Sequence, residues 1–252
     1  IFISPPDDLN HAGWITAGIA ILMTIWWVTE AVPIYATGLI PIVLFPFFNI
    51  FDIQDISSSY AHPLVLLFLG GFIIASAMES CGLHKRIAIN ILSISGTSPA
   101  MIIAGFMIAT ALISMWVSNT ASTIMMLPIA TSVIAIFSSQ KQSKENDLTI
   151  PLLLAIAYSA SIGGIATLIG TPTNVMLASI LSDNHNYNIG FFDWFKIGVP
   201  ITLILLPVVW FFSTNIIFKL SKNKSNALQV TISDLKKDIG KSSFAEKIVA
   251  IV

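Results

Sequence analysis

The sequence predicts an all-α polytopic membrane protein, and its composition and the length of its apolar stretches are the reasons. Only 10% of the 252 residues are charged and 55% are hydrophobic, whereas a soluble domain carries roughly 25% charged residues. The mean hydropathy is +0.85. Apolar stretches of about 18–20 residues recur along the chain, and each is long enough to cross a hydrocarbon core of about 30 Å. The net charge of −1 gives no reason to expect a nucleic-acid partner.

The apolar stretches, bounded by polar, glycine or proline residues, divide the chain into predicted elements. Region 1–98 holds three scaffold-type spans and an interfacial helix, at about 13–30, 33–50, 63–78 and 82–95. Region 99–138 holds two apolar arms, 99–117 and 121–138, and region 139–183 holds a long stretch with interruptions. A span is expected in 184–220, a cytoplasmic linker helix in 221–243 and the start of a further span in 244–252.

The basic residues predict the orientation of these spans. We take the side that holds Lys85 and Arg86 as cytoplasmic. Alternation of the spans then brings the charged loop 141–147 and the lysine-rich tail 219–241 to the same side, as the positive-inside rule requires. The segment 52–62, which has two acids and no Lys or Arg, falls outside. The topology is therefore consistent with the distribution of charge.

A polar cluster, Ser118-Asn119-Thr120, separates the two apolar arms of region 99–138. Ser and Asn are favoured N-caps, and the second arm starts directly after them. The first backbone N–H groups of that arm lack intrahelical partners, and the helix dipole makes this end positive. Such a helix start attracts anions.

A second polar cluster, Gly170-Thr171-Pro172-Thr173-Asn174, interrupts the long stretch in 139–183. Thr171 is expected as an N-cap, and Pro172 suits the first helical position. Upstream, Gly163 and Gly164 loosen the same stretch. A break here frees carbonyls, which suit a hard cation such as Na⁺, as well as N–H groups, which suit a carboxylate. Irregular backbone of this kind persists at depth only where it is buried in protein or lines a cavity.

The pairing of the two clusters predicts a binding site for a small anion. Any one of these Ser, Thr, Gly or Pro residues alone is ordinary in a membrane helix. Two discontinuous helices with polar tips, however, are typical of the binding sites of secondary transporters. No Lys or Arg accompanies either cluster, so cations are expected to neutralise the anion. This composition favours cation-coupled uptake of a small multivalent anion.

Four motifs resemble those of one transporter family. Residues 116–128 (WVSNTASTIMMLP) resemble the first Ser-Asn-Thr hairpin of the divalent anion:sodium symporter (DASS) family. Residues 158–174 (YSASIGGIATLIGTPTN) resemble that family's first broken helix, with Thr173 where proline is frequent. Residues 27–33 and 67–79 are similar to its earlier spans. The resemblance covers nearly the whole chain.

The resemblance implies the architecture of an ion transporter with two inverted repeats, an elevator motion and a homodimer. The chain would be the first repeat, with a re-entrant hairpin at 99–138 and a broken transmembrane helix of the transport domain at 139–183. The second repeat would lie in a longer protein of which this chain is roughly the first half. By this resemblance the substrate is bound by Ser118, Asn119, Thr120, Thr171 and Pro172, and sodium by Ser114, Ser118, Asn119 and Gly170.

The function expected from residues and resemblance together is sodium-coupled import of C4-dicarboxylates such as succinate, malate or fumarate across a prokaryotic plasma membrane. A sodium-independent dicarboxylate exchanger and a sulfate or citrate symporter of the same family are the alternatives. An anion channel, in which the same polar tips would conduct, belongs to a different class. An intramembrane enzyme is the least favoured, because no Ser/His or Asp pair at depth offers a nucleophile with its base.

Overall fold

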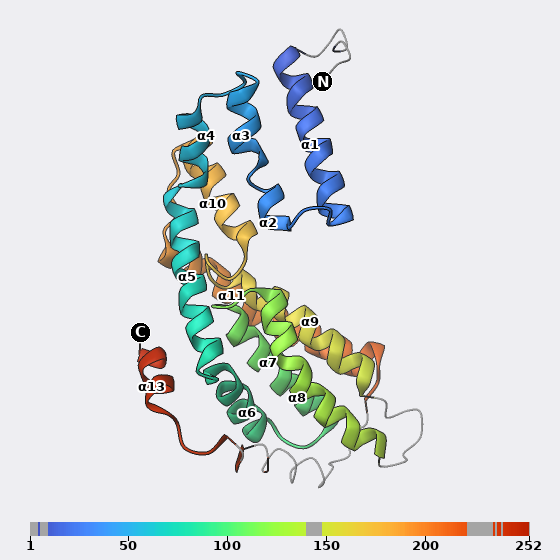
Figure 1. Cartoon of the computed structure of the whole chain (residues 1–252). Coiled ribbons are helices and arrows are strands. Elements are labelled where there is room, and N and C mark those ends of the chain that lie inside the picture. Colours follow the sequence, from blue (N-terminus) through green and yellow to red (C-terminus); the bar gives the residue numbers. More distant parts are fainter. Residues whose placement is uncertain are drawn as a thin grey trace. The chain divides into compact units, whose positions relative to one another are not determined.

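The computed structural model describes residues 10–139, 148–220 and 239–251, together with Pro5, Asp234, Lys236 and Lys237. All regular structure within these residues is helical (Figure 1), so the predicted all-α class is confirmed. Three helical stretches in this part of the chain, two of them made of consecutive helices, are long and apolar enough to cross a bilayer. They are His11–Thr29, Ile53–Ser80 and Phe191–Ile217.

The chain divides into two compact units, residues 1–66 and 67–252. The first unit contains α1 (His11–Thr29), α2 (Ile34–Thr37), α3 (Ile40–Phe47), α4 (Ile53–Tyr60) and the first turn of α5 (Pro63–Ser80). Helix α1 begins where the side chain of Asn10 accepts a hydrogen bond from the Gly13 N–H, at 2.7 Å. The indole of Trp27 donates to the Ile34 carbonyl at 3.1 Å and so joins the end of α1 to α2.

The stretch predicted as a span at 33–50 contains two helical segments, since α2 ends at Thr37 and α3 begins at Ile40. Pro41 is the physical reason. It has no N–H to donate to the carbonyl of Thr37, and its ring clashes with a carbonyl four residues earlier. The chain bends at Gly38 instead, and the Gly38 carbonyl accepts a hydrogen bond from the Tyr60 hydroxyl at 2.6 Å.

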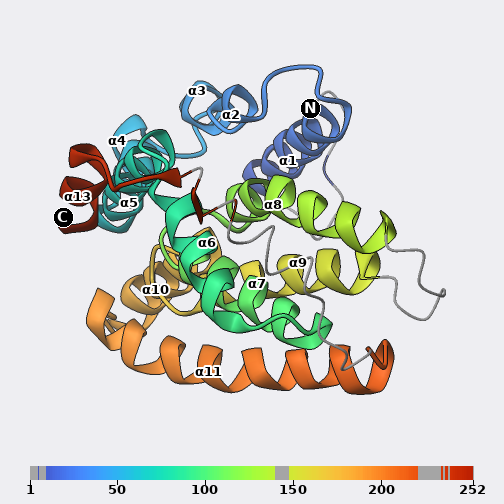
Figure 2. The same cartoon turned by 90° about the horizontal axis from the view of Figure 1, so that it is seen from below.

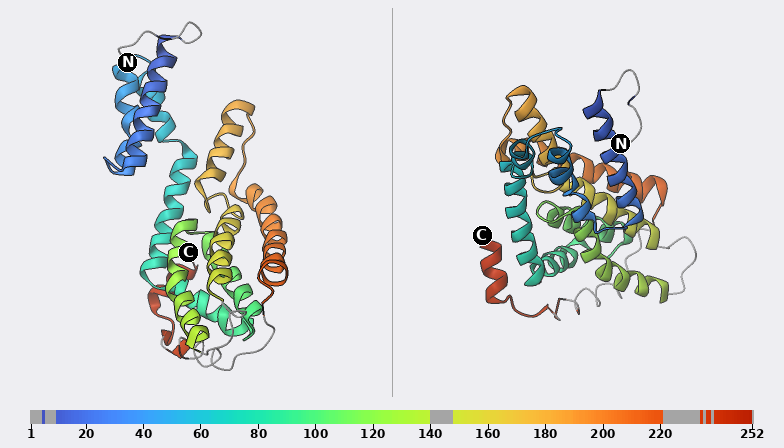
Figure 3. Two further views of the ribbon diagram at one scale, coloured as in Figure 1. Left: turned by 90° about the vertical axis from the view of Figure 1, so that its right-hand side faces the viewer. Right: turned by 45° about the horizontal axis from the view of Figure 1, so that its top comes forward.

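The second unit contains the rest of α5 and the helices that carry both polar clusters. These are α6 (Leu83–Ser95), α7 (Pro99–Ser114), α8 (Asn119–Ser139), α9 (Thr149–Ile165), α10 (Pro172–His185), α11 (Phe191–Phe211), the π-helix η2 (Phe212–Ile217) and α13 (Phe244–Ile251). Helix α13, red in Figure 3, packs against α6.

Helices α7 and α9 form the centre of the second unit. Eleven of the 16 residues of α7 and nine of the 17 residues of α9 are buried. Helix α9 packs against α7, α8 and α11 (Figure 2). At the crossing of α7 and α9, a Cβ on Gly163 would overlap the backbone of Ala111. The two helices therefore approach through their main chains, which small residues allow in membrane helices.

Most predicted elements of the second unit have helical counterparts. The interfacial helix expected at 82–95 corresponds to α6, the two arms to α7 and α8, and the span at 194–218 to α11 with η2. The interrupted stretch is two helices, α9 and α10, joined by the non-helical segment 166–171. The charged loop 141–147 and most of the predicted linker helix 221–243 lie outside the described residues.

Candidate functional site

The tip of the α7–α8 hairpin is built around an N-cap. Helix α8 begins at Asn119, and the hydroxyl of Ser118 accepts a hydrogen bond from the backbone N–H of Ala121 at 3.3 Å. Asn119 and Thr120 are the first two residues of α8, so their backbone N–H groups have no intrahelical acceptor. This end of α8 is positive, and its free N–H groups can donate hydrogen bonds to an anion or to water.

Two oxygen atoms lie close to the hydroxyl oxygen of Ser114 at the end of α7, so that three oxygens lie together. The buried hydroxyl oxygen of Ser114 lies 2.8 Å from Oδ1 of Asn119 and 2.7 Å from the main-chain carbonyl oxygen of Ala160 in α9. A serine hydroxyl has one proton and can donate to only one of these acceptors. We call these three atoms the oxygen cluster. Hard cations bind to oxygen ligands, including main-chain and Asn carbonyls, so these three oxygens are candidate ligands for a cation.

The break between α9 and α10 brings the second polar cluster to a helix start. Thr171 is the N-cap in extended conformation, although its side chain makes no capping hydrogen bond, and Pro172 is the first helical residue. The Thr171 hydroxyl lies 3.3 Å from that of Thr173. Because Pro172 has no N–H, Thr173 supplies the first free backbone donor of α10. This helix start therefore offers mainly hydroxyl groups.

Two glycines let the hairpin tip and the break meet. A Cβ on Gly164 would overlap Oδ1 of Asn119, and a Cβ on Gly170 would overlap the Gly164 carbonyl oxygen. The Thr167 hydroxyl also donates to the Met115 carbonyl at 2.5 Å, which joins the break to the end of α7. The tip of the hairpin and the segment 166–171 are therefore in direct contact.

Asn174 stabilises the break from the side of α10. Its buried amide nitrogen donates to the carbonyls of Gly164, at 2.9 Å, and Thr167, at 2.8 Å. The Gly164 carbonyl lacks its regular helical partner because α9 ends at Ile165. The Thr167 carbonyl lies in the break and also accepts the N–H of Gly170, at 3.3 Å. One amide group has two protons, so Asn174 can satisfy both carbonyls at once.

The predicted site residues differ in how close they lie to the oxygen cluster. Ser114 and Asn119 lie in the oxygen cluster, and Gly170 packs against Gly164 beside it. Ser118 is a helix cap and Thr120 is exposed at the start of α8. Within the described part of the chain, Thr171 and Pro172 make no hydrogen bond with the hairpin; both lie at the start of α10.

Several residues at the site were not predicted. Ala160 acts through its main-chain carbonyl, and no side-chain pattern signals that role. Asn174 has a signal, a polar side chain directly after the Thr-Pro-Thr break, which faces inward. The indole of Trp194 donates to the carbonyl of Ile165 at 2.9 Å. Thr202 donates in the same way to Ile162, at 3.0 Å.

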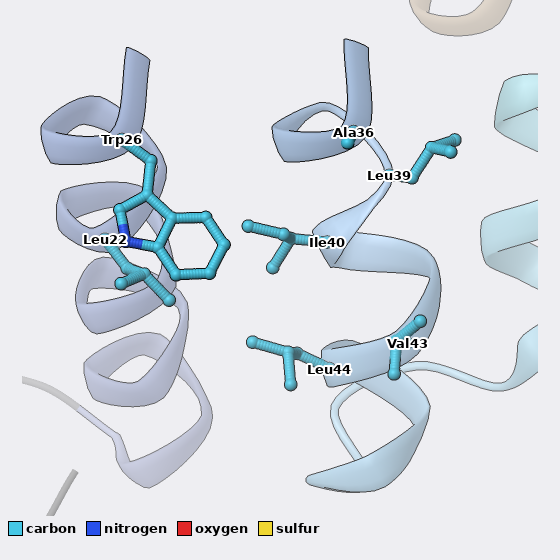
Figure 4. Close-up of a pocket in the computed structure, with 7 residues that line it drawn as sticks. All are labelled: Leu22, Trp26, Ala36, Leu39, Ile40, Val43 and Leu44. Atoms are coloured by element: carbon cyan, nitrogen blue, oxygen red, sulfur yellow. The ribbon is translucent and has the colours of Figure 1, made fainter. Parts of the chain in front are cut away.

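A groove in the first unit differs from the hairpin tip and the break in that apolar side chains line it. It has a volume of about 420 Å³ and lies between α1 and the helices α2 and α3 (Figure 4). Its walls are apolar side chains: Leu22, Trp26, Ala36, Leu39, Ile40, Val43 and Leu44. No charged group lines it, and it offers no oxygen cluster for a cation. The hairpin tip and the break are therefore the better candidates for ion binding.

Comparisons with known proteins show that the chain is similar to transporters. Residues 24–252 match the family described as citrate transporter (CitMHS). The chain is 37% identical, over 98% of its length, to a sodium-dependent dicarboxylate transporter, SdcS, of Staphylococcus aureus (strain USA300). It is 38% identical over its whole length to the SdcS of Staphylococcus saprophyticus. It covers 48% and 50% of these two proteins, so it spans about half the length of the curated relatives it matches.

Proposed function

Since the chain belongs to the citrate transporter family, we propose that it contributes half of the binding site of a sodium-coupled importer of C4-dicarboxylates. The chain is an integral membrane protein of the prokaryotic plasma membrane, and its family indicates a transporter rather than an enzyme. Succinate, malate and fumarate are the substrates we propose, because two relatives carry the name sodium-dependent dicarboxylate transporter.

The oxygen cluster is the observation that carries the proposal. The Ser114 hydroxyl, Asn119 Oδ1 and the Ala160 carbonyl are neutral oxygens of two side chains and one main chain. They fit a monovalent cation, which needs several oxygens and no formal counter-charge. Sodium, as a co-transported ion, would be bound here. Two further residues complete the proposed sodium site. Ser118 is the helix cap beside Asn119, and Gly170 is the glycine that lets the segment 166–171 approach Gly164.

The carboxylate of the substrate would lie at the starts of α8 and α10. The backbone N–H groups of Asn119 and Thr120 are its proposed donors in α8, together with the Ser118 hydroxyl. Thr171 supplies a hydroxyl from α10, and Pro172 shapes the first turn there. A helix start with free N–H groups binds anions without a basic side chain.

The shared residue Asn119 explains how binding of the two ions would be coupled. Its side chain faces the cation and its main chain the anion. Two opposite unit charges 4 Å apart attract by about 4 kcal/mol at an effective dielectric constant of about 20. The dicarboxylate would thus bind weakly until sodium is present, which is the thermodynamic requirement of a symporter.

The larger arrangement is part of the same proposal. The α7–α8 hairpin would be re-entrant, with its tip near the bilayer midplane, and the chain would form the first of two inverted repeats. The binding site would move across the membrane as an elevator within a homodimer. The break between α9 and α10 supports this proposal, because discontinuous helices near the midplane are typical of such transporters.

Uptake of labelled succinate into proteoliposomes, with and without an inward sodium gradient, tests the proposed function. The complete gene product is reconstituted, and we expect uptake to require sodium. Sodium-independent counterflow would favour an exchanger instead. Currents too large for carrier turnover would favour a channel. Competition by sulfate or citrate would favour a sulfate or citrate symporter.

A further inference from the structure

One face of α11 lies along the end of α9. Trp194, Gly198 and Thr202 are four residues apart, so they project from the same side of the helix. The indole of Trp194 and the hydroxyl of Thr202 donate to carbonyls of α9. A Cβ on Gly198 would come within 2.5 Å of the Ile165 carbonyl oxygen. We call these three residues the α11 face; Figure 2 shows α11 beside the other helices of this unit.

The α11 face satisfies carbonyls that the break leaves without partners. The last four carbonyls of a helix have no intrahelical donor, and a buried carbonyl without a donor costs free energy. In α9 each of them is paired: Ile162 with Thr202, Gly163 with the N–H of Ala166, Gly164 with Asn174, and Ile165 with Trp194. Two of the four donors therefore come from α11.

These carbonyls belong to the turn that orients the oxygen cluster. In a regular helix the Ala160 carbonyl accepts the N–H of Gly164, and Gly164 lies between Ile162 and Ile165. The α11 face holds Ile162 and Ile165 from one side. If that hold is lost, the last turn can move, and the Ala160 carbonyl moves away from Ser114 and Asn119.

Helix α11 also contacts the tip of the hairpin through aromatic rings. Trp116, two residues before the cap residue Ser118, stacks on Phe191 with a centroid distance of 6.4 Å and an interplanar angle of 28°. Phe191 in turn stacks on Phe195 at 6.4 Å. The first turns of α11 therefore contact both parts of the site, the tip of the hairpin and the end of α9.

We propose that Trp194 and Thr202 are positioning residues of the proposed sodium site. By holding the last turn of α9, they fix the distance between the Ala160 carbonyl and the side chains of Ser114 and Asn119. Neither residue is expected to touch the cation or the dicarboxylate. This inference rests on the proposed function, since it concerns the affinity for the co-transported ion.

The test compares the half-saturating sodium concentration of succinate uptake in the complete gene product and four variants. Trp194→Phe and Thr202→Val remove one donor each and keep most of the side-chain volume. Their matched controls also lose one donor. Trp210→Phe removes an indole that donates to the Ala100 carbonyl, in the first turn of α7, at 2.8 Å. Thr110→Val removes a buried hydroxyl that donates within α7, to the Phe106 carbonyl at 2.7 Å.

We expect Trp194→Phe and Thr202→Val each to raise the half-saturating sodium concentration about three- to tenfold, the effect of one lost hydrogen bond. The maximal uptake rate at saturating sodium stays close to that of the wild type, and Thr202→Ser restores the sodium affinity. A purely structural role would instead lower the amount of folded protein and the maximal rate, without a change in sodium affinity.

Three outcomes would overturn the inference. One is a sodium affinity that shifts no more in the two variants than in Trp210→Phe and Thr110→Val. Another is a tighter affinity, which would mean that the freed carbonyl binds sodium itself. The third is sodium-independent uptake by the wild type, which alone would also refute the proposed function. If Trp194→Phe does not fold, the sodium affinities of Thr202→Val and Thr202→Ser test the inference, and equal affinities of these two variants would overturn it.

Discussion

Asn119 joins the two kinds of binding that the candidate site offers. Its Oδ1 belongs to the oxygen cluster, 2.8 Å from the Ser114 hydroxyl, while its backbone N–H is the first of α8. A Cβ on Gly164 would overlap the same Oδ1, so the side chain fits closely against α9. A change at this one residue should therefore affect cation and anion together.

Asn119→Ala is expected to lower sodium-dependent succinate uptake about 10- to 100-fold, since hydrogen bonds to charged groups contribute roughly 1.5–3 kcal/mol each. Uptake into proteoliposomes measures the effect, and size-exclusion chromatography checks that the variant folds. Asn90→Ala is the matched control, because Asn90 is exposed on α6. Near-normal uptake by the Asn119 variant would contradict the site.

Residue types predicted the helix caps of the candidate site better than they predicted all the members of the oxygen cluster. Ser118, expected as a cap, accepts a hydrogen bond from the N–H of Ala121. Thr171 occupies the expected N-cap position, but its hydroxyl lies against Thr173 rather than over the helix start. The place of the Ala160 carbonyl in the oxygen cluster could not be predicted, because the approach of two helices, and not the residue's side chain, determines where a main-chain oxygen lies.

At the scale of elements, the crossing of α7 and α9 determines whether the oxygen cluster forms. Ser114 is in α7 and Ala160 in α9, and the glycine at the crossing is Gly163. A Cβ there would overlap the backbone of Ala111, which cannot rotate away as a flexible side chain could. Separation of the two helices would pull the cluster apart.

Gly163→Ala is expected to destabilise the protein by about 1–3 kcal/mol, the usual cost of overpacking a close contact. Thermal unfolding in detergent should therefore show a lower Tm for this variant. Gly70→Ala in α5 is the control, since nothing lies within 4 Å of a Cβ there. It should leave stability unchanged or raise it by about 0.5–1 kcal/mol. Equal effects of the two substitutions would argue against a main-chain contact at the crossing.

Breaks in helices were predictable only where several signals coincide. At 170–174, glycine, threonine and proline together predicted the break between α9 and α10. At 37–40 the apolar pattern continues through the break, and Pro41 alone did not outweigh it. Proline is frequent in membrane helices, where neighbouring groups satisfy the freed carbonyls. A single proline is therefore an ambiguous signal.

At the scale of the second unit, Arg86 fastens the segment before α13 onto α6. Its guanidinium donates to Glu246, at 3.0 Å, and to the main-chain carbonyls of Ile239, Gly240 and Lys241. Ser243 and Glu246 form a reciprocal capping box at the start of α13, with distances of 2.6 and 3.1 Å. Residues more than 150 positions apart are thereby held together.

Arg86→Ala is expected to release this segment without unfolding the core around α7 and α9. Hydrogen exchange followed by mass spectrometry should show faster exchange in residues 239–251 and unchanged exchange in 99–114. Lys85→Ala is the control, because Lys85 is exposed beside Arg86. Unchanged exchange in 239–251 would mean that other contacts hold the segment.

The family and the membrane class were predictable from the sequence, whereas the depth of the helices in the bilayer was not. The DASS-like motifs led to the family, which the comparisons confirm. Re-entrance of the hairpin remains a prediction, because α7 has 16 residues and α8 has 21. Helices of these lengths can cross a bilayer or turn back within it.

The half-saturating sodium concentration of succinate uptake by Ser114→Ala tests the central claim most directly. Ser114 supplies the oxygen that lies within 2.8 Å of both other members of the cluster. Loss of this ligand is expected to raise the half-saturating sodium concentration at least about tenfold compared with the wild type in the same proteoliposomes. A value equal to that of the wild type would contradict the assignment of the oxygen cluster as the sodium site.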